Sequence, residues 1–362
     1  MALEELSLNI DTLGWNSHFS IEFGRFAGAG MVPARVASAH RHIYSVLCEP
    51  GELVAEVSGR FRREAARPAD FPAVGDWVAV SPRPAEDRAT IHALLPRASC
   101  FSRKAPGEKT EEQVVAANID TALIVMSLDR DFNLRRLERY LTLAWGSGVQ
   151  PVVALNKADL CAEVERRVAD TEAAAVGVPV VALSAEEGRG VEELRAHLPA
   201  ARTAALLGSS GVGKSTIINR LLGAELLATA AVRENDSRGR HTTTHRELII
   251  LPFGAIVVDN PGMREVGVWG GEEDLGGAFA DIEELAAGCR FSDCRHRAEP
   301  GCAVRAAREE GRLSEDRYRS WLKLGRELAF LAMQRDALAL LEEKRRMKSL
   351  SRFQKSFKKR AR

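Results

Sequence analysis

The sequence predicts a multidomain protein in which an α/β domain stands between a small β-barrel and a mainly helical metal-binding segment. Strand-like and helix-like runs alternate between residues 113 and 270, around the segment Gly208–Ser215, which matches the phosphate-binding pattern G-x-x-x-x-G-K-S. Short β-like runs occupy residues 34–112. In residues 271–362, three cysteines surround one histidine, and a basic tail follows. Residues 1–33 are predicted to form an N-terminal extension.

Length and composition indicate a globular protein of several domains. The chain has 362 residues, and since single cores rarely grow beyond about 250–300 residues, two or three domains are expected. No apolar run approaches the ~20 residues that span a bilayer. The acidic N-terminus lacks the apolar core of a signal peptide. We therefore expect a cytoplasmic protein that makes no contact with a membrane.

The N-terminal residues predict an extension followed by a barrel. Residues 1–30 show little hydrophobic periodicity, which indicates a loosely attached extension. Beyond them come short apolar and β-branched runs, separated by glycine, proline and charged residues: ARVAS, HIYSVL, LVAEVSG, DWVAVSP and ATIHALLP. Short strands at this spacing are typical of a small barrel, here of the OB type.

An OB-type barrel would bring candidate RNA contacts with it. Basic residues follow phosphates and aromatic rings stack on bases, so the candidates are Arg60, Phe61, Arg62, Arg63 and Trp77. The alternative is that Phe61 and Trp77 belong to the core while the arginines lie on the surface. For Trp77 the apolar surroundings favour the core.

The central segment has the pattern of a parallel α/β domain. Residues 97–116 are polar, and we expect a linker or a sheet edge there. Strands are then predicted at 121–128, 151–155, 179–183, 203–207, 247–251 and 255–258, and helices at 134–145, 162–176, 191–198 and 215–222. This alternation predicts a mainly parallel sheet with helices on both faces.

The phosphate-binding loop follows an apolar strand and opens a helix, which is the context that the motif requires. Its backbone N–H groups would surround nucleotide phosphates, and the helix N-terminus would add positive potential. Lys214 would act catalytically by reaching the outer phosphates, and the Ser215 hydroxyl would bind Mg²⁺. The predicted nucleotide contacts here are Gly208, Ser209, Ser210, Gly211, Val212, Gly213, Lys214, Ser215 and Thr216.

A guanine-specificity motif, Asn156-Lys157-Ala158-Asp159, follows the predicted strand 151–155. The Asp159 carboxylate can accept hydrogen bonds from guanine N1–H and the exocyclic amine, a donor pair that adenine lacks. Lys157 can lie along the base, and Asn156 can brace neighbouring loops. Because this motif precedes the phosphate loop, whereas the reverse order holds in ordinary GTP-binding proteins, the sequence predicts a circularly permuted GTP-binding domain.

Two further elements complete the predicted GTP site. Ser184-Ala185, at the end of the next strand, would present a backbone N–H to guanine O6. Asp259-Asn260-Pro261-Gly262 has the D-x-x-G pattern, in which Asp259 would hold Mg²⁺ through water and the Gly262 N–H would sense the γ-phosphate. Both follow predicted strands, at the sheet edge where open α/β folds bind ligands.

The segment before the D-x-x-G element supplies the remaining candidates. One hydroxyl of Thr242–Thr244 should complete the Mg²⁺ shell; the sequence does not say which, and Thr243 is taken as the candidate. Met263 follows Gly262 and cannot position water as a glutamine does. His241 is the candidate catalytic group instead, with a solvent-exposed loop histidine as the equally weighted alternative.

A metal site and a long helix are predicted near the C-terminus. Cys289, Cys294, His296 and Cys302 supply four ligands within a short segment, a set that suits one structural Zn²⁺ with no open catalytic position. A helical pattern runs through 313–347, with Ser314 as its N-cap. Its predicted packing face comprises Tyr318, Trp321, Leu322, Leu328, Leu331 and Leu338.

The basic tail leaves two readings open. From Lys344 to Arg362 there are ten Lys or Arg and no acidic residue. Such a block is either a solvated tail or a contact to a phosphate backbone, and charge alone does not decide between them.

The motif order, the G-R-H-T-T-T segment and the Cys-x4-Cys-x-His-x5-Cys cluster closely resemble the ribosome-small-subunit-dependent GTPase A family, RsgA, also called YjeQ or YloQ. The resemblance covers roughly residues 34–340. It implies an OB domain, a permuted GTPase domain and a zinc domain. It also implies a protein that acts late in 30S maturation, binds 16S rRNA near the decoding region and hydrolyses GTP faster on the subunit. We expect the protein to be a monomer. Asn260 departs from the threonine or serine of many members.

Two other functions compete with this interpretation. A non-enzymatic RNA-binding or RNA-remodelling module that responds to nucleotide is favoured by Met263, whereas Lys214, Ser215 and Asp259 favour an enzyme. A phosphate-loop kinase or ATPase is disfavoured by Asp159.

Overall fold

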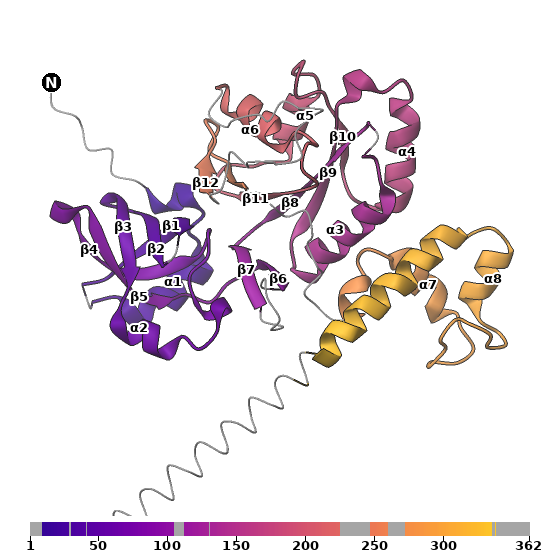
Figure 1. The fold of residues 1–362 in the computed structure, drawn as a ribbon, viewed down its shortest axis with the longest axis horizontal. Helices are drawn as coiled ribbons and strands as arrows, with labels where there is room; N and C mark the ends of the chain where they lie inside the picture. The colour runs from indigo at the N-terminus through magenta and orange to yellow at the C-terminus, as the bar shows by residue number, and fades with distance from the viewer. Residues whose placement is uncertain are drawn as a thin grey trace, which may run out of the picture. The chain divides into compact units, whose positions relative to one another are not determined.

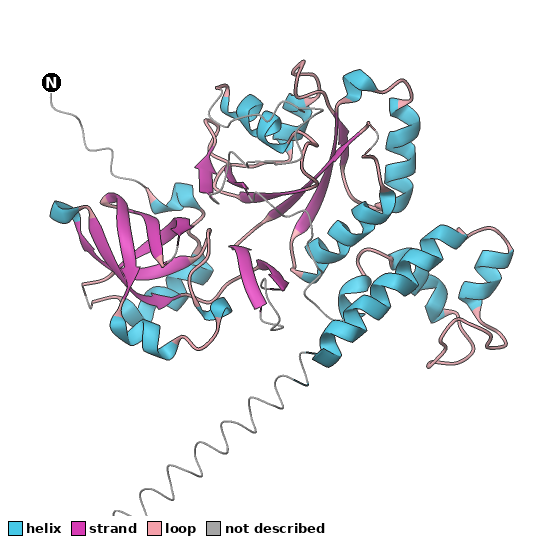
Figure 2. Cartoon of the chain, viewed as in Figure 1, coloured by secondary structure: helices cyan, strands magenta, loops and turns pink. Residues whose placement is uncertain are grey.

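The computed structural model describes residues 9–28, 30–40, 42–104, 112–129, 131–224, 247–259, 272–334 and 337. They fall into two compact units (Figures 1 and 2). One contains the residues through Arg103 and those from Glu112 to Asp259; the other contains those from Glu272 onward. The barrel and the α/β domain thus share one unit, and the boundary predicted between them stays a prediction.

The barrel has five strands, as the sequence predicts: β1 (Val32–His40), β2 (Ile43–Cys48), β3 (Gly51–Val57), β4 (Trp77–Arg83) and β5 (Arg88–Leu94). They pair in the order β1-β2-β3-β5-β4, and β4 returns to pair with β1. Alternate side chains of β3 are buried, as expected for a strand with one face toward a core. The short helix α2 (Gly59–Glu64) follows β3, with Ser58 as its N-cap.

The N-terminal extension packs against the barrel. It contains η1 (Ile10–Leu13), α1 (Ser17–Phe23) and η2 (Gly24–Phe26). Leu13 is fully buried, and the Trp15 ring meets the Trp77 ring edge-on at 4.7 Å between centroids. The expectation of a loosely attached extension is therefore wrong for the described part. The spacing of Trp15, Phe19 and Phe23 at every fourth position was the overlooked signal.

Two of the candidate RNA contacts are buried, Phe61 in the barrel core and Trp77 against Trp15 and Phe19 of the N-terminal extension. Trp77 is fully buried. Neither ring can stack on an RNA base, so the alternative, that they are core residues, is correct. Arg60, Arg62 and Arg63 lie on the surface of α2, where Arg60 pairs with Glu64 at 2.8 Å.

The α/β domain has the predicted alternation. Its strands are β8 (Thr121–Ser127), β9 (Gln150–Asn156), β10 (Val180–Ala182), β11 (Thr203–Leu207), β12 (Glu247–Ile250) and β13 (Ile256–Asp259). Their order is β10-β9-β8-β11-β13-β12, with only β12 antiparallel to its neighbour β13. The helices are α3 (Leu134–Gly146), α4 (Val164–Ala174), α5 (Val191–Ala196) and α6 (Lys214–Leu222). Pairs α3–α4 and α5–α6 contact each other (Figure 1).

Two connections join the barrel to this sheet. Glu247 of β12 pairs antiparallel with Ser38 of β1. The strands of the barrel and of the α/β domain therefore form one continuous sheet. Between the domains, β6 (Cys100–Lys104) and β7 (Glu112–Ala117) form a two-stranded sheet, where the sequence predicted a linker or an edge.

Arg35 fixes the junction between barrel and α/β domain. Its buried guanidinium donates to Thr203 Oγ1 at 2.7 Å, to Asn118 O at 3.2 Å and also to Leu13 O. Burial lowers the pKa of Arg35 to about 10, so the side chain stays charged at neutral pH. One cation therefore ties the extension, the barrel and the start of β11 together.

The second unit is helical. It contains η7 (Glu272–Leu275), α7 (Ala280–Ala287), α8 (Ala303–Glu309) and a helix over 315–334. Ser314 caps this last helix as predicted, since its hydroxyl accepts the Arg317 N–H at 3.2 Å. Of the predicted packing face, Tyr318 and Leu328 are buried, while Leu338 lies outside the described residues. Among the described residues, no helix has both the length and the apolar character needed to cross a membrane.

Candidate functional site

The end of β9 carries the predicted guanine motif. Lys157 has a left-handed backbone with φ of 63°, which turns the chain sharply into η5 (Ala158–Leu160). Asp159 Oδ1 is buried and has no hydrogen-bond partner among the described residues. An unpaired buried acceptor is costly, so this oxygen suits a ligand that supplies an N–H donor.

Asn156 joins this motif to two neighbouring loops. Its buried side chain donates from Nδ2 to Val212 O of the phosphate loop at 2.9 Å. Its Oδ1 accepts the Ala185 N–H at 3.0 Å. The predicted contact of Ala185 to guanine O6 stays a prediction, and in this structure that N–H donates to Asn156.

Lys157 is held by a carboxylate that the sequence analysis missed. Its Nζ donates to Asp129 Oδ2 at 2.8 Å, while the Ser127 hydroxyl donates to Asp129 Oδ1 at 2.7 Å. Partial burial raises the pKa of Asp129, but the bonds from Lys157, the Asp131 N–H and Ser127 outweigh it and lower the pKa to about 2. Asp129 is thus a carboxylate at neutral pH, which fixes the direction of the Lys157 side chain.

The phosphate-binding loop has the backbone that its glycines allow. Gly208, Gly211 and Gly213 have φ values of 149°, 81° and 96°, which other residues rarely adopt. A Cβ at Gly208 would collide with Val125 O, and one at Gly213 would collide with the Asn156 amide. The glycines therefore let the loop pass close to the guanine motif and to β8.

Lys214 and Asp259 mark the phosphate end of the site. Lys214 Nζ donates to Gly208 O at 2.7 Å and to Ser209 O at 2.6 Å, so the lysine lies across the loop. Asp259 is buried at the end of β13. Burial raises the pKa of Asp259, although the Lys214 charge opposes this. Ser215 and Thr216 follow on α6 and are half-buried.

A second overlooked group braces the phosphate loop from α3. Arg136 Nη1 donates to Ser209 Oγ at 2.5 Å and to Asp131 Oδ2 at 2.6 Å. Asn133, the N-cap of α3, accepts the Arg136 N–H at 3.1 Å. In the sequence, this contact was marked only by the run of polar residues after β8. Ser209, the partner of Arg136, lies more than seventy residues further along the chain.

The four predicted zinc ligands meet in the second unit. Their ligand atoms, from Cys289, Cys294, His296 and Cys302, all lie within 4.8 Å of one another. His296 Nδ1 is 3.5 Å from the sulfurs of both Cys289 and Cys302, which are 4.0 Å apart. These separations match the edges of a tetrahedron around Zn²⁺ with ordinary bond lengths of roughly 2.0–2.3 Å.

Neighbouring groups hold the ligand loop in place. The Tyr318 hydroxyl donates to His296 O at 2.7 Å, and His296 has a left-handed φ of 58°. Glu299 accepts the backbone N–H groups of Arg295 at 3.1 Å and Arg297 at 2.8 Å. Backbone N–H groups, its own first among them, lower the pKa of Glu299 to about 2. These hydrogen bonds help to hold the loop that carries Cys294 and His296 in its conformation.

Comparison with known proteins identifies the family. A family model described as RsgA GTPase matches residues 94–269. The small ribosomal subunit biogenesis GTPase RsgA of Opitutus terrae is 46% identical over 359 residues, covering 96% of this chain and 98% of that protein. Its namesake RsgA 2 of Lactiplantibacillus plantarum is 50% identical over 301 residues, covering 83% of this chain and 84% of that protein. The chain belongs to the RsgA GTPase family.

Solved structures agree with this assignment. YjeQ from Thermotoga maritima matches with a TM-score of 0.62 and 29% identity, covering 83% of this chain and 99% of that one. YloQ, described as a circularly permuted GTPase, matches with a TM-score of 0.60 and 24% identity, covering 85% and 96% of the two chains. The predicted fold class, a barrel before a permuted GTPase domain and a helical C-terminal part, is confirmed, as is the resemblance to RsgA.

Several predicted residues of the RsgA-type site lie outside the described residues. They are His241, Thr243, Asn260, Gly262 and Met263, together with the basic tail. The described part brings together the guanine motif, the phosphate loop and Asp259, from strand ends that are far apart in the sequence. It adds Asp129, Asp131 and Arg136 to the set that the sequence predicted.

Proposed function

We propose that this RsgA-family chain hydrolyses GTP to GDP and phosphate and serves as a biogenesis factor for the small ribosomal subunit. The observation that carries the proposal is the buried, unpartnered Oδ1 of Asp159 beside a phosphate-binding loop. A guanine base would supply the missing donors from N1–H and the exocyclic amine. Relatives of high identity over nearly the whole chain carry the name of a small-subunit biogenesis GTPase.

The described residues divide the work of binding GTP and GDP. Asp159 selects guanine, Lys157 lies along the base with its direction set by Asp129, and Asn156 keeps the base and phosphate loops in register. Lys214 exchanges its bonds to the loop carbonyls for bonds to phosphate oxygens. Ser215 and Asp259 would hold Mg²⁺, which neutralises phosphate charge when it is bound.

The attacking water needs a group that the D-x-x-G element does not offer, because methionine stands after Gly262. We assign water positioning to His241, and completion of the Mg²⁺ shell to Thr243. If His241→Ala hydrolyses GTP at the wild-type rate in the presence of small subunits, the assignment to His241 is wrong while the GTPase proposal remains.

The zinc assignment is structural. Three thiolates and one imidazole fill a tetrahedral shell, so no position is left for a substrate. Bound Zn²⁺ would supply a fixed cross-link between the loop of Cys289–His296 and the start of α8.

The partner is the 30S subunit, and within it 16S rRNA. The exposed arginines of α2 and the basic tail supply positive charge for an RNA backbone. We further propose that the protein is monomeric, works in the cytoplasm and makes no contact with a membrane.

The test is GTP turnover by the intact protein with and without purified small subunits, with ATP as control. We expect slow turnover alone, strong stimulation by the subunits and no use of ATP. GTP binding without turnover under either condition would instead support the non-enzymatic RNA-binding module, which Met263 favours.

A further inference from the structure

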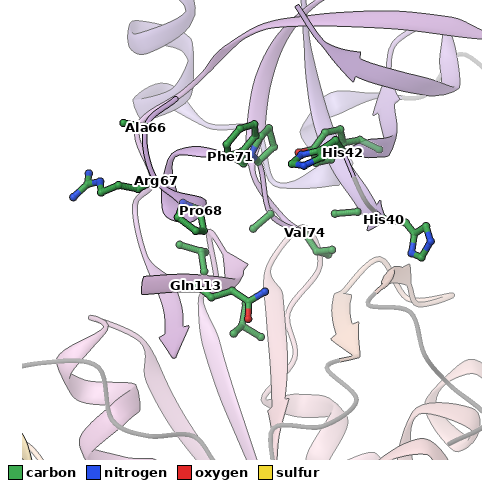
Figure 3. Close-up of a pocket in the computed structure, with 14 residues that line it drawn as sticks. His40, His42, Ala66, Arg67, Pro68, Phe71, Val74 and Gln113 are labelled. Atoms are coloured by element: carbon green, nitrogen blue, oxygen red, sulfur yellow. The ribbon is translucent and has the colours of Figure 1, made fainter. Parts of the chain in front are cut away.

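A cavity of about 440 Å³ opens between the barrel and β7, and none of its lining residues belongs to the nucleotide site. This volume lies within the range of about 300–1,000 Å³ that is usual for small-molecule sites. Figure 3 shows the cavity, with His42 beside Phe71 and with Arg67, His40 and Gln113 around it. The remaining walls are small and apolar, mostly alanine, valine and proline.

Four ring side chains line the cavity: His40, His42, Tyr44 and Phe71. Two of them, Phe71 and His42, contact each other and differ in how they are held. Phe71 is half-buried and its ring contacts Phe61 of the barrel core at 6.1 Å between centroids. His42 is exposed, and its ring centroid is 5.1 Å from that of Phe71 at an angle of 54°. At this separation the two rings contact each other, so no flat group fits between them. The His42 ring is exposed, and a flat group can stack on its open face.

The backbone at His42 is unusual. It has a φ of 74°, in the turn between β1 and β2, where a residue with a side chain is uncommon and carries strain. Glycine, asparagine and aspartate are frequent at left-handed turn positions, and histidine is enriched there as well. The turn thus places an imidazole at the mouth of the cavity.

Positive charge surrounds the cavity on the α2 side. The segment from Gly59 to Asp70 carries four arginines against the two acids Glu64 and Asp70. Arg67, at the rim, pairs with Asp70 at 3.1 Å, and with its side chain 66% exposed this bond contributes little. Such a bond can be exchanged for one to a phosphate at small cost.

We propose that this cavity takes one unstacked base of single-stranded RNA, with the base stacked on the His42 ring, which Phe71 supports, and with Arg67 contacting the adjoining phosphate. The inference rests on the RNA partner named under the proposed function. His42 takes the place of the candidates Phe61 and Trp77, which are both buried.

Gln113 lies on the wall opposite the rings (Figure 3). Its Oε1 accepts a hydrogen bond from Arg103 Nε at 3.1 Å, so its Nε2 is the atom that can donate to the base edge. Proteins that bind single-stranded nucleic acids generally combine aromatic side chains, which stack on bases, with basic side chains, which contact phosphates.

The test measures affinity of the intact protein for a short single-stranded RNA and for a set of the same strands, each lacking one base. For wild type, we expect removal of one particular base to weaken binding about tenfold, and the others to matter less. His42→Ala should bind the complete strand about tenfold more weakly and should be insensitive to removal of that base. His92→Ala, an exposed histidine of β5 outside the cavity, is the matched control and should behave as wild type.

A second measurement needs no variant. 4-Thiouridine at the sensitive position should crosslink to the peptides of wild type that contain His42 or Phe71. Crosslinks confined to other peptides, or equal base sensitivity in wild type and His42→Ala, would overturn the proposal.

Subunit-stimulated GTP turnover on the same preparations separates this inference from the proposed function. Normal stimulation without any His42-dependent base effect would show that only the cavity assignment is wrong. Absence of stimulation would count against the proposed function itself. A His42→Ala protein that binds RNA normally but no longer binds the subunit would indicate a ribosomal protein in the cavity and would also overturn the RNA assignment.

Discussion

The nucleotide site and the zinc site are both made of a few polar side chains, but different forces position them. Around the nucleotide site, Asn156, Asp259 and the phosphate loop leave the ends of strands whose side chains are buried in one apolar core. Around the zinc site, the ligands Cys289, Cys294 and His296 lie in a loop before α8, without regular secondary structure between them.

The difference predicts how each site responds to loss of its ligand. The nucleotide loops already bond to one another, so they should keep their arrangement without GTP, apart from the unpartnered Asp159 oxygen. The loop of the proposed zinc site is held by a few hydrogen bonds and has no regular secondary structure, so we expect it to depend on the bound metal for its stability.

The largest effect is expected for Cys302→Ser. A structural zinc site contributes on the order of 10 kcal/mol, so its loss should unfold residues 272–334 while GTP binding persists. Limited proteolysis with mass analysis, together with zinc content, measures this. Cys161→Ser, which changes a cysteine outside the cluster, is the control. A zinc-free protein with the wild-type cleavage pattern would contradict the contrast.

Asp159→Asn should weaken GTP binding by roughly 10²- to 10⁴-fold. Two hydrogen bonds to a charged acceptor are lost, each worth about 1.5–3 kcal/mol. The free energy of unfolding without nucleotide should stay the same or rise, since the orphaned charge is removed. Calorimetric titration with GTP measures the affinity, and Asp170→Asn on α4 is the control. Wild-type GTP affinity in Asp159→Asn would show that this carboxylate does not contact the base.

Asn156→Ala should cost about 2 kcal/mol of unfolding free energy, because the Val212 carbonyl and the Ala185 N–H both lose a buried partner. Urea unfolding measures the change. Asn133→Ala, which removes the N-cap of α3, should lower the free energy of unfolding by about 1 kcal/mol. It serves as the reference for the loss of one hydrogen-bonding side chain. If Asn156→Ala costs no more than Asn133→Ala, the loops do not depend on this bridge.

The smallest effect is expected for Asp129→Asn, and it should depend on pH. The pKa of Asp129 is about 2 in the folded protein and near 4 in the unfolded chain. The carboxylate therefore stabilises the fold fully above about pH 4, and this contribution is lost as the pH falls toward 2. With the side chain 31% exposed, screening limits the gain to about 1 kcal/mol at neutral pH. Urea unfolding of both proteins across this pH range should show the difference shrinking; a difference that is constant with pH would contradict the assignment.

The sequence predicted those features that local pattern determines. The strand ends, the phosphate loop and the zinc ligands are each marked by short motifs, and their elements lie where the motifs require. Asp129 and Arg136 escaped prediction because their roles depend on partners, Lys157 and Ser209, that only the folded chain brings near. Phe61 was a candidate RNA contact because the local sequence does not show that it is buried. Its burial depends on side chains from other strands of the barrel.

The N-terminal extension shows a different limit. Trp15 and Phe19 contact Trp77 from a short segment whose helical spacing shows an apolar face but not what covers it. Their burial depends on a surface of the barrel that the local sequence does not contain. Arg35 is similar, since a charged residue in an apolar strand is buried only because four separate segments supply its acceptors.

If Asp159 selects the guanine base and GTP is hydrolysed at this site under control of the small subunit, a change at Asp159 should change which nucleotide is hydrolysed. Turnover of GTP and of xanthosine triphosphate is compared for wild type and Asp159→Asn, with and without purified small subunits. The account predicts that wild type uses GTP, that the variant prefers xanthosine triphosphate, and that subunits stimulate both. Unchanged, subunit-stimulated GTP turnover by Asp159→Asn would contradict it.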